Sequence, residues 1–445
     1  MRKKRIAVLG AGPAGAAAAL GLVRLGYQVT VISDWRRFNA IEGTSERVLQ
    51  ALRGIGLRRA SEAAIPAPNR QVLWAGQRSL RNREWLLERP VFDRALRDDL
   101  HQADIEVIEA RVLAVHQAHP DQLSLALDGA GDLDVDFVVD ARGRQAPQSA
   151  EAARGPETLS LLCRWRGQAG EAASAAESLD SGWCWLARLP NGEQYWQWTL
   201  DARHMAMPGR AQLTAWCAER RAATQLAAEF FADDPGAAVE LRARSSTCTL
   251  ASDLCGDRTI RVGDAAMAVD PLSGNGIFQS LSSALQAPAV INTVLQYPAD
   301  APLAQAFHRR RVTELFYRFA RLGRDFYAQV DAAPEQSFWR ERQRWPDDRQ
   351  THMPVTPEAV TTDWAPVVAG DRISQARVVI TPDQPLGIWH LNGVELAPVV
   401  EALREQSWEQ VLAQLQPAQR GAVAGWLQTL GYGPDTGVSG RSVTP

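Results

Sequence analysis

Lysine is almost missing from this chain of 445 residues, because Lys3 and Lys4 are its only examples. Every other basic residue is an arginine. A GC-rich genome produces the same bias, so the bias alone assigns no function. It does argue against any mechanism that needs a catalytic lysine in the body of the protein.

Other absences narrow the class of protein. The five cysteines form no Cys-x-x-Cys pair and no disulfide framework, which predicts a reducing compartment and no cysteine metal site. A net charge of −3 gives no reason to expect a nucleic-acid or membrane partner. No apolar run reaches the ~18 residues of a spanning helix. The basic start and the apolar run to Leu22 imitate a secretion signal, but cleavage would remove a glycine-rich turn, so we expect a cytoplasmic protein.

The order of predicted elements indicates an α/β fold. Residues 6–9 and 29–32 are typical of buried parallel strands, and residues 13–25 between them of a helix. Further helices are predicted at 45–52 (with Ser45 as N-cap), 92–102, 211–231, 277–295, 303–327 and 394–430. Strands are predicted at 106–115, 122–127, 135–139, 159–166, 183–189 and 195–200, and residues 71–88 are irregularly strand-like.

These elements divide the chain into three parts. Residues 1–155 and 256–330 are predicted to form a discontinuous domain of the Rossmann-like α/β kind. Residues 156–255 interrupt it with a mainly antiparallel β-sheet that we expect to hold the substrate. Residues 331–445 change in character and are predicted to be a C-terminal extension or small domain. A second glycine-rich strand–helix unit is missing, which argues against a separate NAD(P)H domain.

The glycine-rich turn after the first strand predicts a dinucleotide site. Gly10 permits the tight turn, Gly12 lets the backbone approach a diphosphate, and Gly15 lets helix and strand pack closely. Pro13 and Ala14 begin the helix, whose free N–H groups and dipole favour the diphosphate. The flanking strands and helix give this turn the setting that the motif requires.

The contact to the adenosine ribose is less regular. The second strand of such a unit usually ends in an acid, but Ser33 stands there and Asp34 follows. A hydroxyl binds ribose less strongly than a carboxylate does. Asp34 is either a ribose ligand or a surface turn residue.

A second motif lies about 250 residues downstream. Asp264 ends an apolar strand, where it can accept hydrogen bonds from a ribityl chain or merely cap the strand. The loop that follows carries Pro271, Gly274, Asn275 and Gly276 before a helix. Its N–H groups can face the flavin pyrimidine edge, where negative charge accumulates on reduction, unless it is an ordinary loop. Together with the glycine turn, this predicts FAD held at both ends, so the discontinuous domain of residues 1–155 and 256–330 is predicted to be an FAD-binding domain.

The chain resembles the superfamily of FAD-dependent aromatic hydroxylases and flavin-dependent halogenases over about residues 5–330. Residues 138–144 look like its Asp-x-x-Gly segment. Residues 89–93 look like its Arg-x-x-x-Asp segment, which implies that Arg89 lies near the flavin. The Glu-Gly-Thr-Ser-Glu-Arg segment that ends at Arg47 is most similar to the halogenase-like branch.

The lack of lysine beyond Lys4 narrows which branch of the superfamily the chain resembles. Halogenases resemble one another in a Trp-x-Trp-x-Ile-Pro segment and in a catalytic lysine. Residues 183–190 are only loosely similar to that segment. Without that amine, hypohalous acid is not captured. The resemblance therefore implies monooxygenation, in which reduced flavin and O₂ form a C4a-hydroperoxide that hydroxylates an electron-rich ring.

Residues of the reaction chamber are not singled out by the sequence. Four tryptophans alternate on neighbouring strands and either line the cavity or are plain sheet aromatics: Trp183, Trp185, Trp196 and Trp198. Three residues are possible general bases, but none stands out: His204, His308 and Glu42. No catalytic residue is predicted.

Within the halogenase-like branch, the chain is especially similar to flavoprotein monooxygenases that mature tryptophylquinone enzymes such as quinohaemoprotein amine dehydrogenase. This implies hydroxylation of a tryptophan in a partner polypeptide, with O₂ and with NAD(P)H or reduced flavin as electron donor. Alternatives are a hydroxylase or reductase of a small aromatic natural product, a halogenase, and a non-catalytic flavin-bound escort protein.

Overall fold

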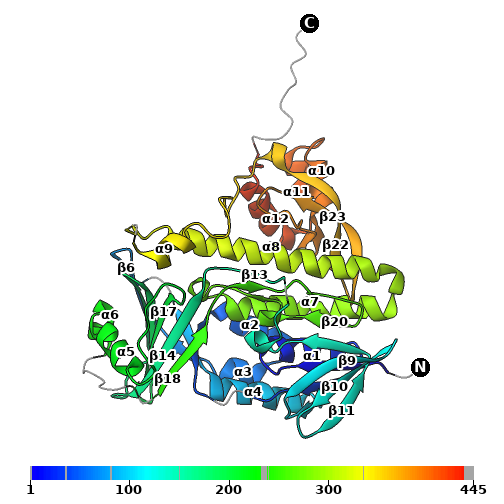
Figure 1. Ribbon diagram of the computed structural model, residues 1–445. Helices are drawn as coiled ribbons and strands as arrows, with labels where there is room; N and C mark the ends of the chain where they lie inside the picture. Colours follow the sequence, from blue (N-terminus) through cyan, green and yellow to red (C-terminus); the bar gives the residue numbers. More distant parts are fainter. Residues whose placement is uncertain are drawn as a thin grey trace. The chain divides into compact units, whose positions relative to one another are not determined.

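The computed structural model shows two compact units. It describes residues 3–35, 38–80, 83–149, 151–231, 238, 240–333 and 335–434. The first unit is Met1–Pro288 with Leu315–Asp348, and the second is Ala289–Glu314 with Arg349–Pro445. Two long helices, α7 (Gly276–Gln296) and α8 (Ala301–Tyr327), contribute residues to both units (Figure 1). The three-part division drawn from the sequence stays a prediction. Its second part falls within the first unit, whereas residues 289–314 of its first part belong to the second unit.

A parallel five-stranded sheet lies at the core of the first unit. Its order is β20-β12-β1-β2-β8, and every neighbouring pair is parallel. The strands are β1 (Arg5–Leu9), β2 (Gln28–Ile32), β8 (Glu106–Ile108), β12 (Phe137–Asp140) and β20 (Thr259–Arg261). Helix α1 (Pro13–Arg24) joins β1 to β2, and its buried alanines permit close packing. The predicted α/β fold, with its opening strand–helix–strand unit, is confirmed.

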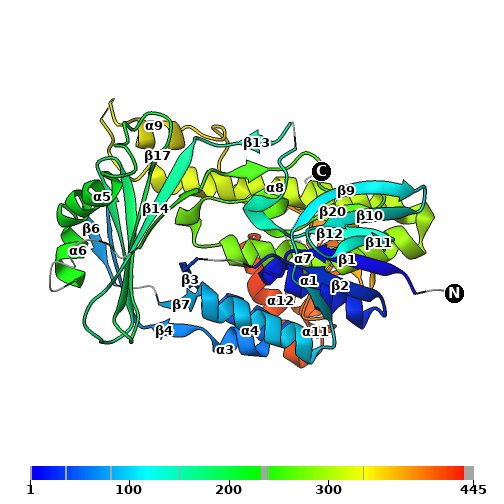
Figure 2. The same ribbon diagram turned by 60° about the horizontal axis from the view of Figure 1, so that its bottom comes forward.

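A larger, mostly antiparallel sheet forms the other part of this unit (Figure 2). Its order is β18-β14-β17-β16-β15-β5-β6, and only the β15–β5 pair is parallel. The strands are β5 (Asn69–Trp74), β6 (Gln77–Ser79), β14 (Thr158–Arg166), β15 (Ala173–Leu179), β16 (Gly182–Arg188), β17 (Glu193–Asp201) and β18 (Glu240–Ser245). Residues 69–79 therefore complete the sheet that the sequence assigned to residues 156–255 alone.

The helix predicted at 211–231 is two helices, α5 (Leu213–Ala222) and α6 (Gln225–Phe230). The reason is a buried cap. The Glu177 carboxylate on β15 accepts hydrogen bonds from the N–H groups of Gln225 and Leu226, at 3.1 and 2.7 Å, and so starts a new helix there.

Shorter elements complete the first unit. Its helices are α2 (Glu46–Ile55), α3 (Arg58–Glu62), α4 (Arg89–Gln102) and α9 (Ser337–Arg342). Its remaining strands are β3 (Ile41–Thr44), β4 (Ile65–Ala67), β7 (Glu84–Glu88), β9 (Val112–His119), β10 (Gln122–Leu127), β11 (Gly131–Val135), β13 (Ala153–Arg154), β19 (Thr249–Leu250) and β21 (Met267–Ala268). The strand predicted at 106–115 is thus two strands, β8 and β9. Ser45 occupies the N-cap position of α2 without a capping hydrogen bond from its side chain.

The second unit has a hydrophobic core of its own. It contains a hairpin that the sequence did not predict, β22 (Thr361–Ala369) with β23 (Arg372–Ile380), and the short strands β24 (His390–Leu391) and β25 (Val394–Glu395). The helix predicted at 394–430 is divided into α10 (Leu396–Ala402), α11 (Trp408–Ala413) and α12 (Pro417–Thr429). A capping box at Ser407 and a proline at the start of α12 explain the two breaks.

Among the described residues, no helix combines the length and the apolar character needed to cross a bilayer.

Candidate functional site

The glycine turn brings backbone groups of two strands together at the carboxyl edge of the parallel sheet. Gly10 has φ +97°, and a Cβ there would lie 2.6 Å from the carbonyl oxygen of Ala141. A Cβ on Gly15 would lie 1.9 Å from the Gly10 carbonyl oxygen. Around Gly12, in contrast, an added Cβ meets no atom within 4 Å. Two glycines therefore permit tight packing, and the third leaves the backbone open where α1 begins.

The downstream motif lies directly against this turn. Gly263 ends the strand region with φ +61°, and a Cβ there would come within 2.8 Å of the Ala14 Cβ, next to Pro13 in the first turn of α1. The chain thus brings together two motifs that are about 250 residues apart in sequence. A cofactor that is held at both ends requires the two motifs to be adjacent in this way.

Asp264 keeps its carboxylate within reach of a ligand. The hydroxyl of Ser280 on α7 donates to its Oδ1 at 3.1 Å, and the Arg144 Nε lies 3.6 Å from its Oδ2. Burial raises the pKa of the Asp264 carboxyl, while Arg144 opposes that shift. The side chain is still 33% exposed, so its oxygens can accept further hydrogen bonds.

The loop after Asp264 is held rigidly. Asp270 accepts a hydrogen bond from the Leu272 N–H at 2.9 Å, in a 3₁₀ turn that spans Pro271–Ser273. The Asn275 side chain donates to the Ser273 carbonyl oxygen at 2.6 Å. Gly274 has φ +60°, and an added Cβ at Gly274 or at Gly276 would meet no atom within 4 Å. The loop therefore presents open backbone at the start of α7.

Arg47 and Arg89 differ in what they can do. Arg47 is exposed on the first turn of α2, with its guanidinium 5.2 Å from the ring of Phe278 on α7, close to the open loop. Arg89 is buried, donates to Glu42 at 2.9 Å and also binds Asp93. Burial opposes the charged guanidinium, but the two carboxylates outweigh it, so the pKa of Arg89 is raised. Arg89 joins β3 to α4, and its predicted place beside the flavin stays a prediction.

Ser33 and Asp34 lie at the end of β2, beside the glycine turn. The Gly10 N–H donates to the Ile32 carbonyl oxygen at 2.7 Å, which places Ser33 one residue from that contact. The Ser33 hydroxyl accepts from the Trp35 N–H at 3.4 Å, and Asp34 is exposed. Both side chains lie at this edge, and the choice between them as ribose ligand stays open.

The four tryptophans do not form one wall. Across the β16–β17 hairpin, Trp183 pairs with Thr199 and Cys184 pairs with Trp198. Directly paired residues share a face, so Trp183 and Trp185 lie on one face and Trp196 and Trp198 on the other. The first pair belongs to a cluster with Tyr327, which Leu272 of the cofactor loop also contacts. The second pair packs with α5 and α6, so of the two alternatives Trp196 and Trp198 are sheet core.

The candidate bases are also separated. His204 is bonded to Asp201 at 2.9 Å and lies 3.6 Å from Glu341, at the end of β17. Burial opposes ionisation of Asp201, but its hydrogen bonds, led by that of His204, hold its pKa below the usual value. His308 belongs to the second unit, and Glu42 is the ion-pair partner of Arg89. His204 and Glu42 are thus already paired with charged side chains, and the structure singles out none of the three as the base.

A buried hydrogen-bond chain that the sequence did not reveal starts at the same loop. The Tyr327 hydroxyl on α8 donates to Asp270 Oδ1 at 2.9 Å, and the Trp183 Nε1–H donates to the Tyr327 oxygen at 3.3 Å. Burial raises the pKa of Asp270, and burial with the Asp270 charge raises that of Tyr327. Tyr327 therefore stays protonated and remains the donor. The Asp-Pro start of the loop was the only sequence signal, and it did not identify a partner 57 residues away.

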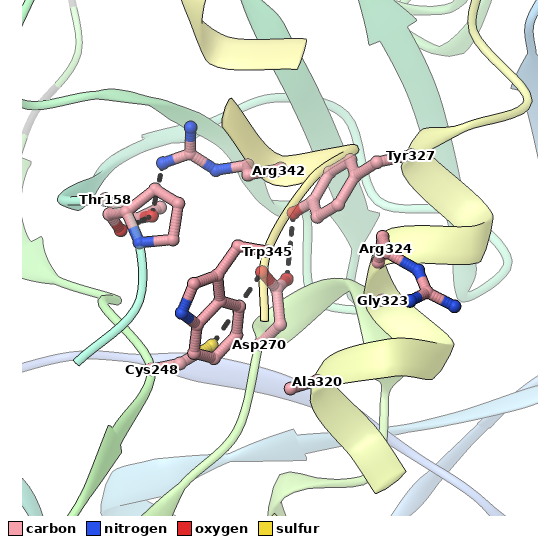
Figure 3. A pocket seen from close by; sticks show the side chains of 10 residues that line it. Thr158, Cys248, Asp270, Ala320, Gly323, Arg324, Tyr327, Arg342 and Trp345 are labelled. Carbon is pink, nitrogen blue, oxygen red and sulfur yellow. Dashed lines mark hydrogen bonds between the residues drawn. The ribbon is translucent and has the colours of Figure 1, made fainter. Parts of the chain in front are cut away.

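Asp270 and Tyr327 also line a small pocket (Figure 3). Its walls include Thr158, Arg342 and Trp345. The pocket therefore begins at the first residue of the loop that is predicted to face the flavin.

Lysine is far from this region. Lys4 precedes β1 and pairs with Asp136 at 3.1 Å, whereas Gly10 follows the opposite end of the same strand. Lys3 adjoins Lys4, so both lysines of the chain lie at the amino edge of the parallel sheet, away from the cofactor loop.

Comparison with known proteins identifies the cofactor. The profile of the FAD binding domain family matches residues 3–314. The chain belongs to this family. The open backbone at Gly12, the accessible Asp264 and the rigid loop 271–276 fit FAD, and this flavoprotein is an FAD-dependent oxidoreductase.

Individual relatives agree with this assignment. Peptidyl tryptophan dihydroxylase QhpG, essential for tryptophylquinone cofactor biogenesis, has 52% sequence identity and a TM-score of 0.85, over 97% of this chain and 100% of that one. At that identity and coverage the two proteins belong to one family. The flavin-dependent halogenase CmlS (17% identity, TM-score 0.75, 96% of this chain and 95% of that one) shares the fold. The predicted resemblance to hydroxylases and halogenases is confirmed.

Curated sequences include a tryptophan 2-halogenase of Chondromyces crocatus, 24% identical over 376 residues, which are 76% of this chain and 70% of that protein. They also include LodB, a putative FAD-dependent oxidoreductase of Marinomonas mediterranea, 26% identical over 375 residues, which are 75% of this chain and 95% of that protein.

Proposed function

We propose that this flavoprotein is a monooxygenase that hydroxylates the indole ring of a tryptophan in a partner polypeptide, twice, as a step in building a tryptophylquinone cofactor. The observation that carries the proposal is the similarity to QhpG, at 52% identity along 97% of the chain. A change of substrate class is not expected at that level of identity across both the cofactor and the substrate parts.

The chain's own residues have separable tasks in this proposal. Bound FAD supplies the two-electron chemistry and the activation of O₂. The open backbone at Gly12 and the first turn of α1 bind the diphosphate, and Asp264 accepts hydrogen bonds from the ribityl hydroxyls. The backbone N–H groups at the start of α7, which begins at the exposed Gly276, stabilise the negative charge of reduced flavin at its pyrimidine edge. The electron donor is NAD(P)H or a reduced flavin.

The face of the large sheet that carries Trp183 and Trp185 supports an aromatic substrate. It shares a cluster with Tyr327 and Leu272, so it adjoins the loop that begins at Asp270. Apolar side chains there exclude water from the reacting ring, which limits wasteful loss of peroxide.

The test is direct. The FAD-loaded full chain is incubated with NADH, NADPH or reduced flavin, O₂ and the partner polypeptide, and the partner is weighed by mass spectrometry. We expect a gain of one and then two oxygen atoms on a tryptophan-containing fragment, and no gain without O₂ or when that tryptophan is replaced by phenylalanine. Flavin that is reduced and reoxidised while the partner mass stays unchanged would contradict the proposal.

Halogenation is the second candidate, because a tryptophan 2-halogenase is among the relatives. The position of both lysines at the amino edge of the parallel sheet argues against it. Adding bromide to the same assay separates the two reactions, since a brominated product has a characteristic isotope pattern and an oxygenated one does not. A small aromatic hydroxylase would modify free indoles without any partner.

A further inference from the structure

Three side chains of metal-ligating types meet at one end of the large sheet. They are Asp201, the last residue of β17, His204 in the turn that follows, and Glu341 on α9. The His204 Nδ1 lies 2.9 Å from Asp201 Oδ2 and 3.6 Å from Glu341 Oε1. The three ligand atoms all lie within 4.8 Å of one another, which no other set of His, Cys, Asp or Glu side chains achieves in the described part of the chain.

The charges of this group do not balance without a further cation. Among the described residues, His204 is the only ion-pair partner of Asp201 and of Glu341. Carboxylates are ionised at neutral pH, so the two acids together carry two negative charges. A neutral imidazole cancels neither charge, and an imidazolium presents a single Nδ1–H to both acids. A divalent cation matches the charge and can bind all three atoms at once.

The spacing of the ligand atoms suits zinc. Bonds from zinc to imidazole nitrogen and carboxylate oxygen are about 2.0–2.2 Å long, which separates two ligands of a tetrahedral ion by roughly 3.3–3.6 Å. The His204–Glu341 distance is within this range, and the His204–Asp201 distance would open slightly. His204 and Glu341 are 42% and 36% exposed, so both side chains can adjust and water can complete the set. Mixed nitrogen and oxygen ligands favour zinc over calcium and magnesium, which prefer oxygen alone.

Asp201 is the fixed ligand of the group. Its side chain is only 2% exposed. Its Oδ1 accepts hydrogen bonds from the N–H groups of Arg203 and His204, at 2.9 and 3.1 Å. Its Oδ2 accepts from the Ser337 hydroxyl at 2.8 Å and keeps a lone pair for a metal. Such outer hydrogen bonds orient a ligating carboxylate, so the group is held in place at its buried end and open to solvent at the other.

We propose that Asp201, His204 and Glu341 bind a zinc ion, with water as the fourth ligand. The ion links the end of β17 to α9, which packs in the aromatic cluster that contains Trp183. Zinc therefore fastens α9 against the sheet face that carries this tryptophan. The role is structural, and it does not depend on the proposed hydroxylation.

The test uses the FAD-loaded full chain, free of any histidine tag and stripped of metals by a chelator. Zinc is titrated by calorimetry, and Co²⁺ serves as a spectroscopic substitute whose visible absorption reports tetrahedral coordination. We expect one zinc ion per chain, with Ca²⁺ and Mg²⁺ binding far more weakly. Zinc should also raise the melting temperature and slow amide hydrogen exchange in α9. A chain that binds no zinc, or that binds Ca²⁺ more tightly, would overturn the proposal.

Variants then assign the ligands. His204→Gln and Glu341→Gln change exposed side chains, so both variants should fold. Loss of an outer hydrogen bond typically costs about 10–100-fold in metal affinity, so loss of a ligand should weaken zinc binding at least about a hundredfold and Ser337→Ala about tenfold. His352→Gln is the matched control. His352 also pairs with an aspartate, Asp383 at 3.3 Å, but belongs to no such group of three among the residues described.

The outcomes are distinct. Equal zinc affinity in the wild type and both ligand variants would place the ion elsewhere and refute the proposal, as would an equally large loss in His352→Gln. Slower exchange in α9 with zinc, seen in the wild type and lost in His204→Gln, would support it. Hydroxylation of the partner polypeptide is measured separately, so its failure would count against the proposed function and leave the zinc site standing.

Discussion

Two glycines with the same backbone conformation make a sharp test of how the cofactor site is held together. Gly263 has φ +61° and Gly274 has φ +60°, so replacing either by alanine costs about 1–2 kcal/mol for a left-handed conformation. Their surroundings differ. The new Cβ at Gly263 would lie 2.8 Å from the Ala14 Cβ, whereas at Gly274 it would meet no atom within 4 Å.

The difference between the two variants therefore isolates the contact between the downstream motif and α1. Gly263→Ala adds an overpacking cost of about 1–3 kcal/mol that Gly274→Ala lacks. At about 2–4 °C per kcal/mol, the melting temperature of the FAD-free Gly263 variant should lie roughly 2–12 °C below that of the Gly274 variant. FAD titration of the Gly263 variant should show weaker binding, because relief of the clash moves the two motifs apart.

The assay is thermal unfolding of FAD-free protein, with wild type and both variants measured side by side. Equal melting temperatures for the two variants would mean that the close approach of Gly263 to Ala14 does not exist in solution. The two-motif grip on the cofactor would then lose its structural basis.

Three further predictions concern the buried polar groups. Tyr327→Phe leaves the Trp183 N–H without an acceptor and Asp270 with one donor fewer, which should lower the free energy of unfolding by about 1–3 kcal/mol in chemical denaturation. Burial raises the pKa of Asp270 in the folded protein, so the free energy of unfolding of the wild type should fall as pH rises from the ordinary aspartate pKa through that raised value. Asp270→Asn should lack this fall when unfolding curves are measured across the same pH range. Arg89→Met strands two carboxylates, Glu42 and Asp93, and should cost about 3–5 kcal/mol at neutral pH, with partial recovery in acid as they take up protons.

The cofactor half of the fold could be predicted because its signals are local. The turn from Gly10 to Gly15 needs those glycines wherever it occurs, and the short apolar strands around it have one partner arrangement. Helices α7 and α8 followed from long apolar periodicity. The breaks within 211–231 and 394–430 depended on caps, one of them from the distant Glu177, which periodicity does not register.

The tryptophans show where sequence reasoning fails in the site itself. Alternation within one strand predicts which residues share a face, but the register between strands decides whether two strands contribute to the same face. Here residue 188 pairs with residue 194, so odd-numbered residues pair with odd-numbered ones. Trp196 and Trp198 therefore lie on the face of the sheet opposite to that of Trp183. A pairing of the two strands shifted by one residue would have put all four on one side.

The partner of Asp270 was unpredictable for a related reason. Tyr327 comes from the end of a long helix, and only the packing of α8 on the first unit brings its hydroxyl to the loop. The hairpin β22–β23 was missed because Pro366 lies inside β22, and a proline within a run argues against a strand.

The pairing of Lys4 with Asp136 has a practical consequence. Amine-reactive dyes, cross-linkers and sensor surfaces find side-chain amines only at one edge of the parallel sheet, whereas the glycine turn opens at the other. Protein labelled or immobilised through these amines should therefore present its cofactor entrance outward in a uniform orientation.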